Sequence, residues 1–226
     1  MNILALDCAV TRISLAVKTE NKFISATYDI GMRQSEILVP SIDELLKKAD
    51  LTAADLDATC LTIGPGSFTG LRLGISALKA IELAYEVPVY GISSLETYAY
   101  PYKNFGLPLI SCIDANKDKF YCRIADGENI LLKDDDYEIE KIIEGARNVK
   151  EALICGPDAA KLAEKLSNAM PEKKYLLPGV PAMTAEALIL ITEDLIAKGT
   201  AALKDFDGPV YLRASEAELK LNSTIS

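Results

Sequence analysis

The chain has 226 residues, of which 50% are apolar and 25% are charged. This length can hold one large domain or two small ones around a sizeable core, and the composition is typical of globular proteins. No apolar run approaches the roughly eighteen residues of a membrane span. The N-terminal apolar run meets an acid at Asp7, which argues against a signal peptide. We therefore expect a cytoplasmic protein that does not enter a membrane.

The net charge, the absence of histidine and the cysteine content limit the kinds of binding and catalysis that the chain can perform. The formal net charge is −9, whereas proteins that hold nucleic acid unaided usually carry a basic face. The sequence contains no histidine, which excludes Ser-His-Asp and Cys-His catalysis and histidine metal sites. The five cysteines are odd in number and lack C-x-x-C spacing, so we expect free, buried thiols. We assign no catalytic residue, no metal ligand and no cofactor of the chain's own.

The first half of the chain is predicted to alternate strands and helices. Short β-branched runs divided by polar turns predict strands at Asn2–Cys8, Arg12–Lys18, Lys22–Ile30, Asp57–Ile63 and Val87–Gly91. Apolar residues at helical spacing predict a helix from about Ser35 to Ala49, in which Pro40 separates the first turn and Ser41 with Glu44 caps a second start. Further helices are predicted at Phe68–Tyr85 and Ser94–Tyr100.

The second half repeats the pattern of the first. The segment ILALDCAVTRISLAV from Ile3 aligns without gaps with ISCIDANKDKFYCRI from Ile110, and the alignment matches Asp7 with Asp114. A predicted strand at 129–132, helix at 137–146, strand at 152–155 and helix at 159–170 follow, and a last helix at 182–198. The acidic run at 134–136 is expected to be a solvated loop. We predict an α/β fold of two lobes, residues 1–103 and 104–226, each a mixed sheet with helices packed on it.

The loop between the strand at 57–63 and the helix at 68–85 has the sequence GPGSFTGLRLG, Gly64–Gly74. Glycines before a helix can bring backbone amides to a phosphate, but no Lys-Ser or Lys-Thr follows, as a Walker motif requires. Steps of three and four place Gly70, Gly74, Ala77 and Ile81 on one helix face. Glycine inside a helix costs about 1 kcal/mol relative to alanine, so a close neighbour is expected to offset it. That neighbour is either the chain's own sheet or a partner.

Several motifs resemble known families. A duplicated three-strand unit with an aspartate ending each first strand resembles the actin-like (ribonuclease H-like) ATPase superfamily. More narrowly, GPGSFTGLRLG, RQSEILVP (Arg33–Pro40), GISSLE (Gly91–Glu96) and PVYLR (Pro209–Arg213) resemble the bacterial TsaB (YeaZ) family, along nearly the whole chain. Two positions depart from the family pattern: its histidine between Gln34 and Ser35 is missing, and Asn116 stands where many members have arginine.

The resemblance implies a non-catalytic scaffold subunit that binds and supports TsaD, which transfers a threonylcarbamoyl group to the adenosine beside the anticodon of tRNA. It implies a TsaD homologue and a TsaE homologue as partners, a homodimer when the chain is alone, and contact with tRNA only through the complex. A nucleotide at a subunit interface is compatible with it. The residues that we predict to bind the partner are Ile37, Leu38, Ile42, Leu45, Gly70, Arg72, Gly74, Ala77 and Ile81. On this basis Gly74→Leu is expected to disrupt pairing and leave the fold largely intact.

A vestigial phosphate or nucleotide site would comprise Asp7, Gly64, Gly66, Ser67, Thr69 and Asp114. The turns after the two aspartates, CAVTR and ANKDK, lack glycine, so a Cβ at each position obstructs a phosphate. The structural alternatives are that the aspartates close turns and that Ser67 or Thr69 caps the helix. Arg72 either faces an anion or is solvated, and Arg213 is expected to dock the tail on an acid.

Three other functions stay open at this stage. The first is an actin-like ATPase or phosphotransferase that uses Asp, Glu or Lys alone. The second is a degenerate peptidase homologue, against which the absence of histidine weighs. The third is a homodimeric structural protein with no role in tRNA modification.

Overall fold

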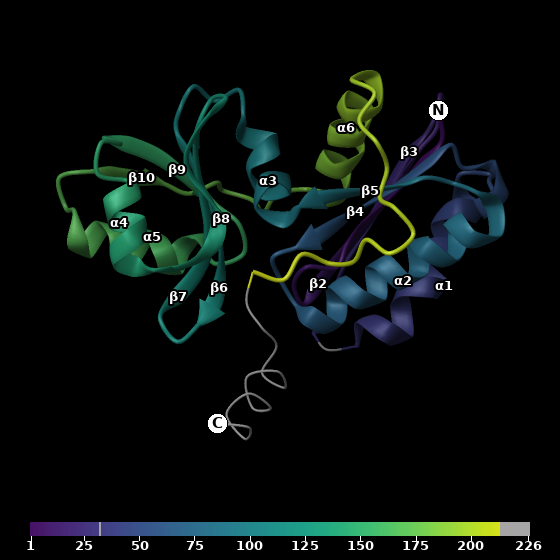
Figure 1. Ribbon diagram of the computed structural model, residues 1–226, viewed down its shortest axis with the longest axis horizontal. Coiled ribbons are helices and arrows are strands. Elements are labelled where there is room, and N and C mark those ends of the chain that lie inside the picture. The colour runs from purple at the N-terminus through teal and green to yellow at the C-terminus, as the bar shows by residue number, and fades with distance from the viewer. Residues whose placement is uncertain (32, 213–226) are drawn as a thin grey trace.

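The computed structural model of the protein describes residues 1–31 and 33–212. Two five-stranded sheets lie side by side, and helices pack on both (Figure 1). The strands of the first sheet are β1 (Ile3–Asp7), β2 (Arg12–Lys18), β3 (Phe23–Asp29), β4 (Ala58–Gly64) and β5 (Val89–Ser93). The strands of the second are β6 (Leu109–Asn116), β7 (Lys119–Asp126), β8 (Asn129–Glu138), β9 (Glu151–Cys155) and β10 (Lys174–Leu176). The helices are α1 (Gln34–Lys48), α2 (Phe68–Tyr85), α3 (Ser94–Ala99), α4 (Ile139–Gly145), α5 (Ala159–Ala169) and α6 (Thr184–Ala197).

The two sheets have the same topology. The first has the order β3-β2-β1-β4-β5, and the second, read from its other edge, has the order β8-β7-β6-β9-β10. In both, the first strand pairs antiparallel with the second and parallel with the fourth. The duplication predicted from the alignment of Ile3 with Ile110 is therefore confirmed, and so is the predicted fold class.

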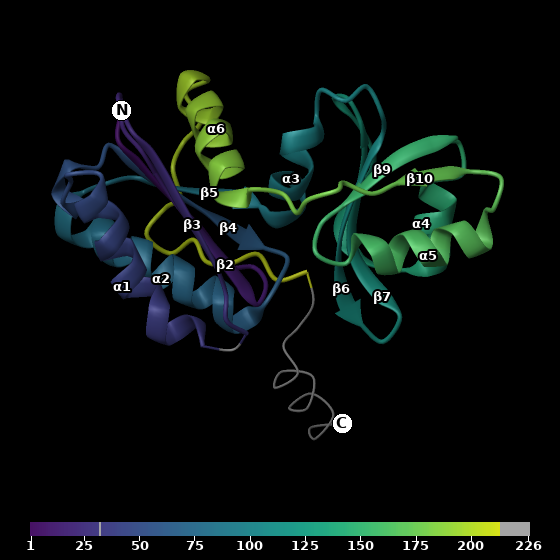
Figure 2. The ribbon, with the colours of Figure 1, turned by 180° about the vertical axis from the view of Figure 1, so that it is seen from behind.

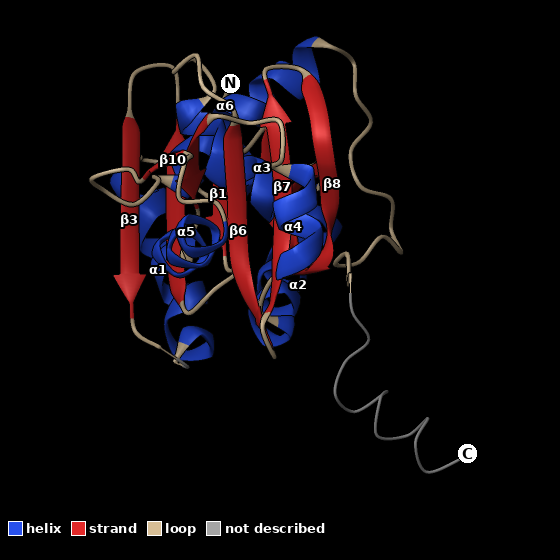
Figure 3. Cartoon of the chain, turned by 90° about the vertical axis from the view of Figure 1, so that its left-hand side faces the viewer, coloured by secondary structure: helices blue, strands red, loops and turns tan. Residues whose placement is uncertain are grey.

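Burial on both faces explains the continuous apolar sequence of β1. Successive side chains of a strand point to opposite faces of the sheet. Leu4 and Leu6 pack toward α1 and α2, whereas Ile3 and Ala5 pack toward α6 on the opposite face. Figure 2 shows α6 and the α1–α2 pair on opposite sides of the first sheet. The second sheet is covered on one face by α4 and α5, which lie in front of its strands in Figure 3.

The helices that end each half contact the sheet of the other half. Although α3 follows β5, it contacts β6 and β7 of the second sheet, and although α6 follows β10, it packs on β1, β2 and β4 of the first. The predicted second lobe, 104–226, thus includes a helix that packs on the first lobe. The division between residues 103 and 104 itself stays a prediction.

Three local predictions were wrong. The acidic run Asp134–Asp136 is not a loop but part of β8, whose pairing with β7 gives its backbone hydrogen-bond partners. Helix α4 accordingly begins at Ile139 rather than at Tyr137. Pro40 does not divide α1, which is one helix with the proline inside it. Since Pro40 and Glu36 are both exposed, water can hydrogen-bond the carbonyl that the proline leaves without an amide.

Candidate functional site

The glycine loop closes onto the turn between β1 and β2. The amide of Ser67 donates to the carbonyl of Ala9 at 2.6 Å. A Cβ on Gly66 would overlap that same carbonyl oxygen. The hydroxyl of Ser67 accepts a hydrogen bond from the amide of Gly70 at 3.2 Å and caps α2. These amides of the loop are therefore committed to contacts within the chain.

Gly70 and Gly74 face the chain's own sheet. A Cβ on Gly70 would overlap the carbonyl oxygen of Cys8, and a Cβ on Gly74 would lie 3.5 Å from the Cys8 sulfur and from Leu61. Both glycines are buried, so neither offers a surface to a partner. The expectation for Gly74→Leu is corrected accordingly. A leucine there would extend into the space of Cys8 and Leu61, so this variant would damage the fold.

Asp7 and Asp114 close equivalent turns in the two lobes. Asp7 Oδ1 accepts hydrogen bonds from the amide of Ala9 at 3.0 Å and from the hydroxyl of Thr62 at 2.8 Å. Asp114 Oδ1 accepts one from the amide of Asn116 at 2.9 Å. In each turn the donor is the amide two residues beyond the aspartate, which is the geometry of an Asx turn. These contacts favour a structural role for both carboxylates over a phosphate-binding one.

Asp114 also forms an ion pair with Lys161. Its Oδ2 accepts from Lys161 Nζ of α5 at 2.6 Å. Burial acts to raise the pKa of Asp114, but the hydrogen bonds from Lys161 and from the Asn116 amide outweigh it and lower the pKa below its ordinary value. The carboxylate is thus stabilised in its charged form by a residue of the same chain.

A cavity of about 370 Å³ lies between the lobes. It is lined by Arg12, Tyr98, Tyr102, the start of α5 and residues 177–182. Its described lining includes none of the six residues predicted for a vestigial phosphate site. Of those six, Gly64 packs under the carbonyl of Val210, and Thr69 is exposed on α2. None of the six residues therefore lines the cavity, although Val10 and Thr11 of the turn after Asp7 do.

The predicted partner residues divide between core and surface. Leu38 and Leu45 are each 1% exposed and belong to the core of the first lobe, so they are corrected to core residues. An apolar groove of about 420 Å³ runs between α1 and α2, and of the predicted residues Ile42, Ala77 and Ile81 line it. Ile37 is half-buried against the same core.

Sequence reasoning missed the most exposed apolar residues of α1 and α2. Val39 and Tyr85, which line it, are 64% and 52% exposed, and Leu83 of α2 is 88% exposed. Their exposure is the property that distinguishes them, and it follows from their position outside the buried stripe of each helix. A search for large apolar side chains outside that stripe would have found them.

Arg72 is held by the segment that follows α6. Its Nε donates to the hydroxyl of Tyr211 at 2.9 Å, and its guanidinium lies 3.8 Å from the centroid of the Phe68 ring. The rings of Phe68 and Tyr211 stack with centroids 4.8 Å apart. Of the motif PVYLR, Val210 donates its amide to the carbonyl of Ile63 at 2.7 Å, and Arg213 lies outside the described residues. This segment closes over the end of β4.

The cysteines of the chain are not placed as reactive groups. All five cysteines are free and buried, as predicted. Burial raises the pKa of Cys60 and of Cys155 to about 12, so neither supplies a thiolate near neutral pH. Within residues 1–31 and 33–212, no three His, Cys, Asp or Glu side chains are grouped as a metal site would need. None of the helices in these ranges is long and apolar enough to cross a membrane.

The chain is similar to proteins of tRNA modification. A family model described as TsaD, tRNA N6-adenosine threonylcarbamoyltransferase, matches residues 31–206. The tRNA threonylcarbamoyladenosine biosynthesis protein TsaB of Escherichia coli is 27% identical over 98% of this chain and 98% of its own length. The TsaB protein of Bacillus subtilis is 30% identical over 59% of this chain and 58% of its own length.

Solved structures support the fold. A Pseudomonas aeruginosa protein described as similar to peptidase YeaZ superposes with a TM-score of 0.78 at 23% identity, covering 94% of this chain and 99% of that one. A Bacteroides thetaiotaomicron protein with an actin-like ATPase fold superposes with a TM-score of 0.51 at 10% identity, covering 84% and 95%. Together with the family match, these similarities show that the chain belongs to the threonylcarbamoyltransferase family, as a member of its TsaB (YeaZ) group with an actin-like fold.

Proposed function

We propose that the chain is a non-catalytic scaffold subunit that binds a TsaD homologue and supports threonylcarbamoyl transfer to the adenosine beside the anticodon of tRNA. The names of its relatives and the family match support a role in this modification. The buried thiols, the turn-closing aspartates and the absence of histidine support a chain that does not itself catalyse the transfer.

The observation that carries the proposal is the apolar groove between α1 and α2. Monomeric proteins rarely leave a contiguous apolar patch open to water, and such patches mark interaction sites. Val39, Leu83 and Tyr85 expose more than half of their surface on these two helices. Two helices of a partner laid against α1 and α2 would remove these side chains from water.

The same groove accounts for the partners. A TsaD homologue is proposed to occupy it in the complex, and a second copy of this chain is proposed to occupy it when the chain is alone. A TsaE homologue would join the pair. With a net charge of −9, the chain is proposed to meet tRNA only through the complex. The proposed place of action is the cytoplasm. The proposal gives the chain no cofactor of its own, and it is compatible with a nucleotide at a subunit interface.

One observation favours a second candidate function, nucleotide binding by the chain itself as in an actin-like ATPase or phosphotransferase. The cavity between the lobes falls in the size range of small-molecule sites. However, the turns after Asp7 and Asp114 lack glycine, and Lys161 already pairs with Asp114. We therefore rank the scaffold function first.

The proposal is tested by replacing the chain in cells of its source with variants and measuring threonylcarbamoyladenosine in tRNA by nucleoside mass spectrometry. Loss of the chain is expected to abolish the modified nucleoside, and the unaltered chain to restore it. Val39→Glu places a charge in the groove at an exposed position, so it is expected to fold and to fail to restore modification.

Phe105→Glu is the matched control, because Phe105 is 62% exposed and lies outside the groove. It is expected to restore modification fully. Unchanged modification in cells that lack the chain would contradict the proposed function. Full restoration by Val39→Glu would contradict the assignment of the groove.

A further inference from the structure

Helix α3 is one of the elements through which the two lobes meet. This helix lies between the sheets, and its Leu95 and Tyr98 are buried against Ile113 of β6 (Figure 1). Apolar burial is roughly proportional to area and has no preferred direction. These contacts therefore hold the lobes together, but they leave small rotations of one lobe against the other inexpensive. A hydrogen bond is directional, so a hydrogen bond between the lobes can fix the angle.

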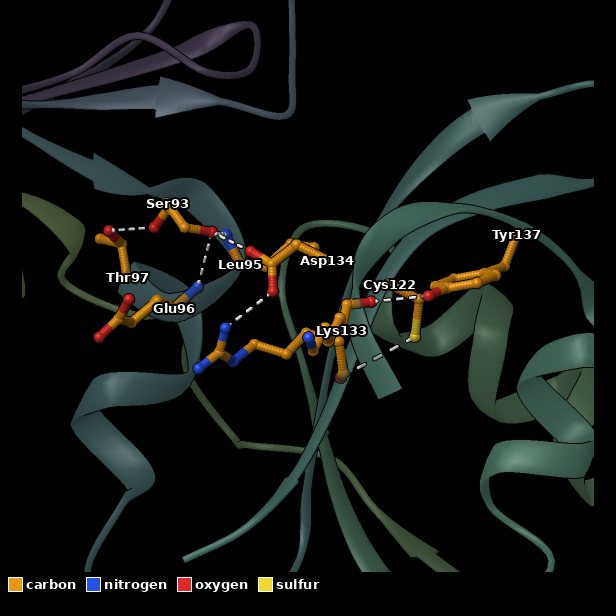
Figure 4. A network of polar contacts seen from close by, with 9 residues as sticks. Ser93, Leu95, Glu96, Thr97, Cys122, Lys133, Asp134 and Tyr137 are labelled. Carbon is orange, nitrogen blue, oxygen red and sulfur yellow. Dashed lines mark hydrogen bonds and ion pairs between the residues drawn. The ribbon is translucent and has the colours of Figure 1, made fainter. Parts of the chain in front are cut away.

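Such a contact lies where α3 begins. Ser93, the last residue of β5, caps α3 by accepting hydrogen bonds from the amides of Leu95 at 3.2 Å and Glu96 at 3.4 Å. Its hydroxyl donates to Asp134 Oδ2 on β8 of the other lobe. Asp134 Oδ1 in turn accepts from Arg123 Nη1 of β7 at 2.8 Å. Figure 4 shows Asp134 reaching from the second lobe to Ser93.

The bonding of these groups makes the contact directional. A serine hydroxyl has one proton and two acceptor positions, and Ser93 uses all three. The Arg123 and Asp134 side chains are 22% and 20% exposed, so water and salt screen this pair less than a surface pair. A hydrogen bond to a carboxylate is stronger than one between neutral groups. Rotation of the lobes would break this bond at a largely dry position.

We propose that the hydrogen bond from Ser93 to Asp134 holds the two lobes in one relative orientation and so fixes the width of the cavity between them. It explains why Asp134, in a run expected to be solvated, is largely buried, whereas its neighbour Asp135 is exposed. The proposal also assigns a role to the GISSLE motif (Gly91–Glu96), because its residue Ser93 both caps α3 and hydrogen-bonds the second lobe. The inference does not rest on the proposed function, because it concerns the chain without a partner.

The test measures the distance between the lobes. Glu20 and Glu128 are exposed, one in each lobe, and Glu20→Cys with Glu128→Cys allows a spin label on each. The five native thiols are buried and will not compete for the label. Pulsed electron paramagnetic resonance is expected to give one narrow distance distribution. Asp134→Ala is expected to broaden it about twofold, because the lobes then sample several orientations.

Asp135→Ala is the matched control, since it removes an exposed carboxylate from the same strand. It is expected to leave the distribution unchanged. A distribution in Asp134→Ala as narrow as in the unaltered chain, or equal broadening by Asp135→Ala, would overturn the proposal. Cooperative thermal unfolding establishes that each variant is folded.

If Asp134→Ala does not fold, the same distance measurement on Ser93→Ala tests the proposal. Ser93→Ala removes both the cap of α3 and the bond to the second lobe, whereas Ser67→Ala removes only a cap, that of α2. The proposal expects broadening by Ser93→Ala and none by Ser67→Ala. The same width in both variants would overturn it.

Discussion

Gly70 and Gly74 lie one turn apart on α2 and differ in what stands opposite them. Alanine at either position gains about 1 kcal/mol of helix propensity. At Gly70 the new Cβ would overlap the backbone carbonyl of Cys8, which cannot rotate away. Overpacking of this kind typically costs about 1–3 kcal/mol. We expect Gly70→Ala to lower the free energy of unfolding by up to about 2 kcal/mol in urea denaturation.

Gly74→Ala is the matched control in the same helix. Its Cβ would lie at an ordinary contact distance of 3.5 Å from its neighbours, so the gain in propensity is not opposed. We expect this variant to be unchanged or more stable by up to about 1 kcal/mol. Equal effects of the two substitutions would contradict the assignment of Gly70 to close packing on the turn after β1.

The ion pair of Asp114 with Lys161 predicts a dependence of stability on pH. The pKa of Asp114 is lowered in the folded protein, so its contribution is fully present above the unfolded pKa of about 3.9. The contribution is lost as the pH falls through the folded pKa. Because Lys161 is 46% exposed, the contribution is at most about 1 kcal/mol. Asp114→Asn is expected to be less stable by up to that amount at pH 7 and equal to the unaltered chain at low pH.

A double-mutant cycle separates this pair from other effects. In a Lys161→Gln background, Asp114→Asn is expected to have a smaller effect on unfolding at pH 7. The same loss of stability in both backgrounds would show that Lys161 does not stabilise the carboxylate. A difference between Asp114→Asn and the unaltered chain that persists below both pKa values would contradict the linkage.

At the scale of elements, periodicity predicted most of the fold. The short apolar runs that became β1 and β2 recur as β6 and β7, and the repeat correctly implied two sheets of one topology. Periodicity could not say which sheet α6 covers. Its residues are apolar on more than one face, which indicates burial, but the choice of sheet depends on contacts far apart in the sequence.

The elements that prediction missed have specific causes. The acids at 134–136 resemble a loop, yet β8 is an edge strand, where charged residues are tolerated and one of them reaches the other lobe. Pro40 resembles a helix break, yet it lies on the exposed side of α1. In both cases the local propensity is real: at Asp134 tertiary contacts outweigh it, and at Pro40 exposure to water reduces the cost of the lost hydrogen bond.

The candidate site could be predicted only in part. The glycine spacing on α2 correctly indicated a close neighbour at Gly70, where a Cβ would overlap the Cys8 carbonyl oxygen. A closely packed partner helix would equally require the absence of a Cβ, so the sequence could not distinguish the two. In the structure Gly70 and Gly74 pack against Cys8, which follows β1, whereas Ala77 and Ile81 line the groove. Val39 and Tyr85 were missed because they fall outside the buried stripe that periodicity detects.

At the scale of the whole molecule, two features bear on how the chain works. A cavity separates the lobes, and an apolar groove lies on the outer face of the first lobe, away from that cavity. A partner bound at the groove, as proposed, would therefore leave the lobe interface untouched. The apolar surface on the first lobe is suited to bind a second protein. Because the chain is acidic, we propose that tRNA binds to the assembled complex and not to this chain alone.

The central claim, that the α1–α2 groove binds a partner, is tested most directly by size-exclusion chromatography with light scattering. The samples, at micromolar concentration, are the unaltered chain alone, the TsaD homologue of its source alone, and a mixture of the two. The chain alone and the mixture are then repeated with the Val39→Glu variant in place of the unaltered chain. We predict a homodimer alone, a one-to-one complex in the mixture, and neither for Val39→Glu at an unchanged melting temperature. A monomer that forms no complex, or normal pairing by Val39→Glu, would contradict the account.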